Sequence, residues 1–236
     1  MKQHRFIGNF NLHQRTLTLD DQKLVHQMHE VLKLQVGEEL ILCDGKLREA
    51  RARITALNKR RGEVTVLGVN ELKNEPGAKT TLYCAILKNN NFDLVAEKAT
   101  EVGVQKIVPI ITERTVKLNL KTERIRKIMK EAAEQCGRGM VPQCEEPMKF
   151  PDALNHAAHN NINIIFDPTA NDQLPTSNFQ LPEIGIFIGP EGGWTKEEMR
   201  RARKQNCKIL SLGFLTFRAE TAAIIAAYLI NHAHHE

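Results

Sequence analysis

The 236-residue sequence lacks the features that define several large protein classes. Its longest uninterrupted apolar run, residues 222–230, is too short to cross a bilayer, and the first residues include no apolar segment typical of a secretory signal. The five cysteines form no Cys-x-x-Cys pair, which argues against a disulfide framework or a structural zinc site. We therefore expect a cytoplasmic protein that has no membrane segment and binds no metal.

Two nucleotide-binding motifs are also missing. The chain has no Gly-x-Gly-x-x-Gly and no Gly-x-x-x-x-Gly-Lys-Ser/Thr sequence, which weighs against a nicotinamide dehydrogenase and a standard NTPase. Three histidines near the end, His232, His234 and His235, are the one candidate metal cluster. A frayed, solvated chain end is the more usual reason for such a group.

The composition is that of a folded soluble protein, with 42% hydrophobic and 26% charged residues. The net charge of +5 is unevenly placed, because residues 1–73 hold 13 Lys and Arg against 9 Asp and Glu. A basic N-terminal third suits a polyanionic partner such as RNA, although many basic proteins bind no nucleic acid.

Residues 1–73 have the pattern of a small β-barrel domain. Strands are predicted over 38–43, 49–57 and 64–69, and Asp44-Gly45 is a typical hairpin turn. Helical spacing of apolar residues is confined to residues 20–34. The polar, breaker-rich segment 70–79 predicts a boundary, which divides the chain into domains 1–73 and 74–236.

From residue 80 onward, strand and helix patterns alternate, which is typical of an α/β domain with a mainly parallel sheet. The expected strands are 81–87, 105–111, 161–166, 184–188 and 208–212. The expected helices are 91–102, 122–136, 195–206 and 220–232, of which the third opens with a capping box formed by Thr195 and Glu198.

Two segments that link a strand to a helix stand out. Gly-Pro-Glu-Gly-Gly at 189–193 follows a buried strand, where glycines would let a ligand approach the backbone. The segment 211–221 ends in Arg218, Glu220 and Thr221 at the start of the last helix. Each segment also has a purely structural explanation. The glycines at 189–193 would equally suit a tight turn, and Arg218 and Glu220 could be a charge pair at the N-terminus of a core helix.

Two further segments offer cations. Glu134 and Arg138 are spaced as an i,i+4 surface ion pair, but the end of this helix could also present Gln135 and Arg138 to a substrate. Arg114 lies just past a predicted strand end, where it could do the same.

Taken together, the motifs resemble those of one family. The sequences Glu-Lys-Ala-Thr-Glu-Val-Gly at 97–103, Glu-Arg-Thr at 113–115, Glu-Ala-Ala-Glu-Gln-Cys-Gly-Arg at 131–138, Gly-Pro-Glu-Gly-Gly at 189–193 and Arg-Ala-Glu-Thr-Ala at 218–222 occur in this order. The chain resembles the bacterial 16S rRNA uracil-N3 methyltransferases of the SPOUT superfamily. The N-terminal part resembles their PUA-like barrel.

The resemblance implies an enzyme that uses S-adenosylmethionine, has a deep trefoil knot in its SPOUT domain, works as a homodimer and methylates N3 of a uridine in 16S rRNA. The basic N-terminal part with few aromatic residues favours rRNA within the small ribosomal subunit as the substrate, and free rRNA stays open as the alternative. Arg218 and Glu220 would be catalytic. Cofactor binding would involve Ile188, Gly189, Pro190, Glu191, Gly192, Leu212, Gly213, Leu215, Thr216, Phe217, Thr221 and Ala222. RNA would be bound by Arg5, Arg15, Lys33, Arg51, Arg114, Gln135 and Arg138.

Two positions depart from the family pattern, and two other functions stay open. Leu215 stands at a position where the family usually has an arginine. Lys33 also stands at a position where the family's N-terminal domain usually has an arginine. The missing arginine leaves a catalytically silent RNA-binding assembly factor as one alternative. The other is a SPOUT methyltransferase that acts on a ribose 2′-oxygen or a purine nitrogen of another RNA.

Overall fold

The computed structural model describes residues 3–73, 75–116, 118–174 and 183–232. The chain divides into two compact units. The first comprises Met1–Glu75 with Ala133–Val141, and the second Pro76–Ala132 with Pro142–Glu236. A division into functional domains at 73/74 stays a prediction from the sequence.

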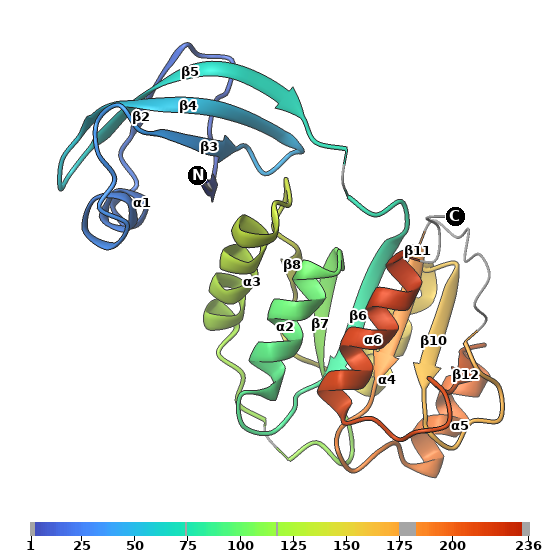
Figure 1. Cartoon of the computed structure of the whole chain (residues 1–236). Helices are drawn as coiled ribbons and strands as arrows, with labels where there is room; N and C mark the ends of the chain where they lie inside the picture. Colours follow the sequence, from blue (N-terminus) through green and yellow to red (C-terminus); the bar gives the residue numbers. More distant parts are fainter. Residues whose placement is uncertain (1–2, 74, 117, 175–182, 233–236) are drawn as a thin grey trace. The chain divides into compact units, whose positions relative to one another are not determined.

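The first unit is built on a five-stranded sheet with the order β1-β3-β4-β5-β2 (Figure 1). Its strands are β1 (His4–Ile7), β2 (Thr16–Leu19), β3 (Glu39–Cys43), β4 (Arg48–Leu57) and β5 (Gly62–Glu71). β1 runs parallel to β3, and the other pairs are antiparallel. Within residues 3–73 no pairing joins the edge strands β1 and β2, so the expected barrel takes the form of a five-stranded sheet.

The period-two pattern of β4 shows why this sheet forms. Ala50, Ala52 and Ile54 are buried, and the arginines between them are exposed. The hairpin at Asp44 and Gly45 is confirmed, with Gly45 at a φ of +72°.

The helix expected at 20–34 is present but shorter. It consists of α1 (Gln22–His26) and the π-helix η1 (Gln27–Val31), and Val25 and Met28 from these helices pack in the core of the unit. Asp21 caps α1 by accepting hydrogen bonds from two backbone N–H groups.

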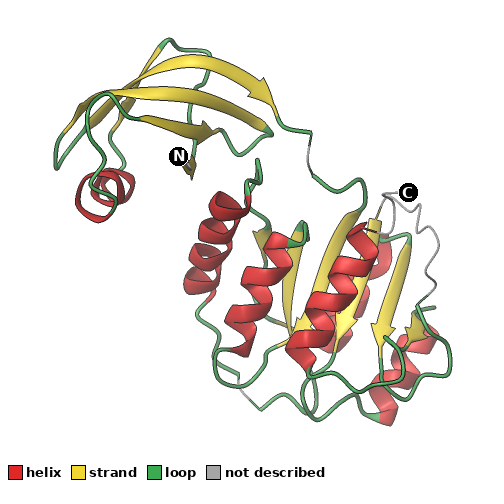
Figure 2. Ribbon diagram, in the orientation of Figure 1, coloured by secondary structure: helices red, strands yellow, loops and turns green. Residues whose placement is uncertain are grey.

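The second unit is a seven-stranded sheet with helices on both faces (Figures 1 and 2). The strands are β6 (Lys79–Ala85), β7 (Lys106–Ile111), β8 (Gln143–Cys144), β9 (Met148–Lys149), β10 (Ile162–Phe166), β11 (Glu183–Ile188) and β12 (Lys208–Leu210). Their order is β12-β10-β11-β6-β7-β8, and β9 also pairs with β7. All pairings described in this sheet are parallel, as expected from the alternation of strands and helices.

The helices are α2 (Asn91–Glu101), α3 (Thr122–Cys136), α4 (Phe150–His156), α5 (Lys196–Lys204) and α6 (Ala219–His232), with the short 3-10 helix η2 (Ala157–His159) after α4. α2 and α6 pack together over one face, and α4 covers the other (Figure 1). The capping box of Thr195 and Glu198 is confirmed at the start of α5. No helix within the described residues is long and apolar enough to span a membrane.

The connection into α6 bears on the predicted knot. β12 is an edge strand, yet α6 packs against β6 and β11 in the middle of the sheet. This return of the chain favours the knot, which stays a prediction from the family resemblance.

Candidate functional site

A pocket of about 550 Å³ lies in the second unit where four parallel strands end. Its wall is formed by the segments that follow β6, β10, β11 and β12, and by the start of α6. Ligands of open α/β sheets bind at this edge. The pocket is lined by Lys88, Asn89, Asn91, Phe166, Asp167, Pro168, Ile188, Gly189, Pro190, Glu191, Gly193, Trp194, Leu212, Leu215, Thr216, Phe217, Arg218, Ala219, Glu220 and Ala222.

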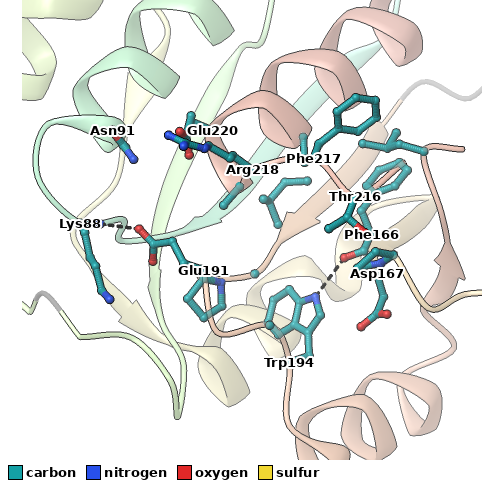
Figure 3. Close-up of a pocket in the computed structure, with 18 of the residues that line it drawn as sticks. Lys88, Asn91, Phe166, Asp167, Glu191, Trp194, Thr216, Phe217, Arg218 and Glu220 are labelled. Carbon is teal, nitrogen blue, oxygen red and sulfur yellow. Dashed lines mark hydrogen bonds between the residues drawn. The ribbon is translucent and has the colours of Figure 1, made fainter. Parts of the chain in front are cut away.

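The first loop, residues 189–195 between β11 and α5, forms one wall and is bonded to two neighbouring strand ends (Figure 3). Glu191 Oε1 accepts a hydrogen bond from the backbone N–H of Lys88, after β6, at 2.8 Å. Trp194 Nε1 donates to the carbonyl oxygen of Phe166, at the end of β10, at 3.1 Å. A Cβ atom on Gly189 would lie 2.9 Å from Trp194 Cε2, so the indole ring occupies the space beside this glycine.

The second loop, residues 211–218 between β12 and α6, forms the opposite wall. Gly213 has a φ of +127°, a conformation that favours glycine. Phe214 and Leu215 are 97% and 75% exposed, although Leu215 also lines the pocket. An apolar side chain thus stands at the position where the family usually has an arginine.

Glu220 has an unsatisfied carboxylate at the pocket wall. Its side chain is buried, and Oε2 has no hydrogen-bond partner among the described residues. A buried acceptor without a donor is costly, so this oxygen is suited to a donor on a bound ligand. Arg218, two residues earlier, is exposed and lines the same pocket.

Most of the residues predicted from the sequence to bind the cofactor line this pocket. They are Ile188, Gly189, Pro190, Glu191, Leu212, Leu215, Thr216, Phe217 and Ala222, together with the predicted catalytic Arg218 and Glu220. Gly192, Gly213 and Thr221 lie outside the lining. The roles of all these residues stay predictions.

The sequence motifs do not indicate the parts of the pocket that follow β6 and β10. Lys88, Asn91 and Asp167 follow strands that the pattern did predict. The rule that places ligands at the carboxyl ends of parallel strands would have pointed to them. Trp194, directly after the glycine motif, was also not singled out as a contact.

The cations predicted to bind RNA differ in how far they are already paired. Arg5 Nη2 lies 2.7 Å from Glu49 Oε2, and Arg138 Nη2 lies 2.6 Å from Glu75 Oε2; both pairs lie within the first unit. Arg114 bonds to the first loop. By contrast, Arg15 and Lys33 are exposed, as is Gln135. Arg51 is exposed too, and its Nε lies 3.8 Å from Glu39 Oε2, which is a longer ion pair than those of Arg5 and Arg138.

Other chemistry at this edge is limited. Burial raises the pKa of the Cys84 thiol in β6, and the nearby carboxylates of Glu191 and Glu220 raise it further. Cys84 is therefore protonated and unsuited to act as a thiolate nucleophile. Within the described ranges no group of three His, Cys, Asp or Glu side chains could hold a metal ion, and His234 and His235 lie outside those ranges.

This fold, with a pocket at the carboxyl edge of its parallel sheet, matches that of RNA methyltransferases that carry an additional PUA domain. Residues 73–231 match the family model of an RNA methyltransferase domain, and residues 30–67 match that of an RNA methyltransferase PUA domain. The ribosomal RNA small subunit methyltransferase E of Rickettsia conorii is 32% identical over 96% of this chain and 94% of that protein. The chain belongs to the ribosomal RNA small subunit methyltransferase E family.

Solved structures agree with this assignment. The ribosomal RNA small subunit methyltransferase E from Neisseria gonorrhoeae, bound to S-adenosyl methionine, superposes with a TM-score of 0.89 and 30% identity over 96% of this chain and 95% of that one. A Legionella pneumophila protein with bound cofactor gives the same TM-score and identity, over 99% of this chain and 98% of that one.

Proposed function

We propose that the chain transfers a methyl group from S-adenosylmethionine to N3 of a uridine in 16S rRNA, in the cytoplasm and as a homodimer. The observation that carries the proposal is the pocket between the first and second loops, in a chain similar over nearly its full length to a methyltransferase solved with this cofactor. The SPOUT motifs named from the sequence supply much of its wall.

The pocket fits the cofactor in size and in chemistry. Its volume of about 550 Å³ lies within the range usual for sites of small molecules. Ile188, Leu212 and Phe217 provide apolar surface, and the carboxylate of Glu220 provides an acceptor that lacks a partner. When bound, S-adenosylmethionine supplies a methyl group activated by a positively charged sulfur. Because the sulfur loses this charge during the transfer, a dry and weakly polar pocket favours the reaction.

Arg218 and Glu220 are the proposed catalytic residues. Uracil N3 carries a proton that must leave before the nitrogen can attack, so negative charge develops on the uracil oxygens. The guanidinium of Arg218 can stabilise that charge. Glu220 either accepts the N3 proton or orients Arg218.

RNA binding is assigned to the first unit, whose exposed cations Arg15, Lys33 and Arg51 would contact phosphates. Arg15 belongs to a groove of about 660 Å³, which Arg48 and His13 also line. Leu67 and Val69 of β5 are exposed in the same groove and offer apolar surface to unstacked bases. The methylated base must itself leave its stack to reach the pocket.

Exposed apolar side chains on the second unit support the homodimer. Tyr228 and Leu229 of α6 and Leu94 of α2 are exposed, and these two helices pack against each other. A second copy of the chain would cover them. Sedimentation velocity of the purified protein tests this part of the proposal, and a monomer at micromolar concentration would contradict it.

Mass mapping of 16S rRNA from a deletion strain, with and without the restored gene, tests the reaction. The expected result is loss of one N3-methyluridine and its return on complementation. A missing 2′-O-methyl or purine methyl group would support the alternative methyltransferase. Unchanged rRNA together with no S-adenosylhomocysteine binding in calorimetry would support the silent RNA-binding factor.

A further inference from the structure

The turn that follows β7 is bonded to the first loop by two side chains that do not line the pocket. These are Arg114, within the turn, and Glu198, in the first turn of α5. We call them the bridging residues. Through them the first loop is connected to the segment after β7. Its other two connections are the bond of Glu191 to the segment after β6 and the bond of Trp194 to the end of β10.

Glu198 bridges through a buried carboxylate. The residue is 3% exposed. Its Oε2 accepts from the backbone N–H of Thr195 at 2.8 Å, and its Oε1 accepts from that of Glu113 at 3.0 Å. One oxygen thus serves the loop and the other the turn. A capping box alone needs only the first of these bonds, so the second is an additional function of this side chain.

Arg114 makes the second bridge. Its Nη1 donates to the carbonyl oxygen of Gly192 at 2.7 Å and, at a longer 3.5 Å, to that of Trp194. A Cβ on Gly192 would lie 3.3 Å from Arg114 Cβ, so the glycine lets the arginine pass close to the loop. These bonds hold the outer side of the loop, whereas Gly189, Glu191 and Trp194 face the pocket.

We propose that Arg114 and Glu198 are positioning residues of the cofactor site, which set the shape of the first loop from outside the pocket. The proposal rests on the proposed function, because it takes the pocket to be the site of S-adenosylmethionine. A loop held in its binding conformation loses less entropy when the ligand binds, so removing the bridges weakens binding without removing any ligand contact. Arg114, predicted from the sequence to bind RNA, is here assigned to the cofactor loop.

The test measures S-adenosylmethionine affinity by isothermal titration for the wild type, Arg114→Ala, Arg114→Lys and Glu198→Gln. Glutamine can accept only one of the two backbone N–H bonds, and lysine keeps the positive charge on a single donor nitrogen in place of the three nitrogens of the guanidinium. We expect Arg114→Ala to lose on the order of tenfold in affinity, and lysine to recover part of it. Arg200→Ala and Glu197→Gln are matched controls, because these side chains of α5 do not line the pocket and bond only to each other and to Arg201 in the described structure. We expect both controls to bind like the wild type.

Tryptophan fluorescence separates positioning from general stability. Trp194 is the single tryptophan of the chain and is buried in the pocket wall. Loosening of the first loop should shift its emission to longer wavelength in Arg114→Ala and not in Arg200→Ala, at a temperature where thermal melting shows both variants folded.

The outcomes are distinct. Wild-type affinity and emission in both Arg114→Ala and Glu198→Gln would overturn the inference, as would a lower melting temperature with unchanged affinity. Unchanged cofactor affinity with weaker RNA binding would return Arg114 to the RNA contacts. A wild-type protein that does not bind S-adenosylmethionine would instead overturn the proposed function.

Discussion

The indole Nε1 of Trp194 donates a hydrogen bond to the carbonyl oxygen of Phe166 at 3.1 Å, and so joins the first loop to the end of β10. The same ring packs against Phe150 of α4, with centroids 4.9 Å apart. Trp194 therefore connects the pocket wall to the core beneath it. Its hydrogen bond is the part that a smaller aromatic residue could not replace.

Trp194→Phe should keep the ring contact and lose this bond. The buried Phe166 carbonyl would be left without its donor, which costs about 1–3 kcal/mol of unfolding free energy. We also expect weaker S-adenosylmethionine binding, because the first loop loses one of its connections. Denaturant unfolding followed by circular dichroism, with calorimetry beside it, provides the measurement. Unchanged stability and affinity would mean that this hydrogen bond contributes no net free energy to folding or to cofactor binding.

Gly189→Ala should reduce cofactor affinity by about tenfold or more, because any Cβ there meets the Trp194 ring at 2.9 Å and must displace it. Gly77→Ala is the control, since a Cβ at Gly77 meets nothing within 4 Å. Calorimetric titration of both variants checks this. Equal affinities in the two would show that the first loop tolerates the displacement and does not define the pocket.

Much of this region could be predicted from the sequence, and the reasons differ from element to element. The buried run before Gly189 and the capping box of Thr195 and Glu198 are local signals, so β11 and α5 were placed within two residues of each end. β8 and β9 have two residues each, too few to show a period. The bond from Trp194 to Phe166 spans 28 residues, and no local pattern carries such a pairing.

The residues predicted to bind RNA show the same limit. Charge and position in the sequence indicate Arg5, Arg114 and Arg138 just as strongly as they indicate Arg15 and Lys33. Whether a guanidinium is free for phosphate depends on its partner in space, such as Glu49 beside Arg5. A single sequence does not reveal these pairings.

Single-turnover methyl transfer to rRNA across a pH series tests the catalytic pair. Arg218→Ala should react about a hundredfold or more slowly at unchanged cofactor affinity, because its charge is needed most when N3 loses its proton. Glu220→Gln keeps the shape of the side chain, and higher pH should restore its rate if Glu220 accepts that proton. If Arg218→Ala loses affinity in proportion to rate, Arg218 is structural. A normal rate in Arg218→Ala would show that Arg218 is not catalytic, and a residue of segment 134–138 would become the first candidate for that role.

The salt dependence of RNA binding tests the first unit. Removing one cation that binds a phosphate should flatten the slope of log affinity against log salt by about one unit, so Lys33→Ala combined with Arg51→Ala should lower it by about two. Arg200→Ala in the second unit is the control for removal of a surface charge. An unchanged slope in the double variant would exclude both residues from phosphate binding. Arg15→Ala tests the groove in the same way.

Arg138 is expected to act on stability rather than on RNA binding. Its Nε and Nη2 donate to Glu75 Oε1 and Oε2 at 3.2 and 2.6 Å, and the two side chains are 6% and 10% exposed. Arg138→Ala would leave the Glu75 carboxylate buried without this partner, which costs about 3–5 kcal/mol when a buried pair is broken.

The matched variant is Arg5→Ala, which breaks the more exposed pair with Glu49 in the same unit and should cost less. Urea unfolding of both variants, with the salt slope of RNA binding measured on the folded protein, separates the two roles. A flatter slope for Arg138→Ala with little loss of stability would mean that the pair with Glu75 opens to receive a phosphate. Because a bidentate guanidinium–carboxylate pair holds both partners in a fixed geometry, we expect the slope to stay that of the wild type.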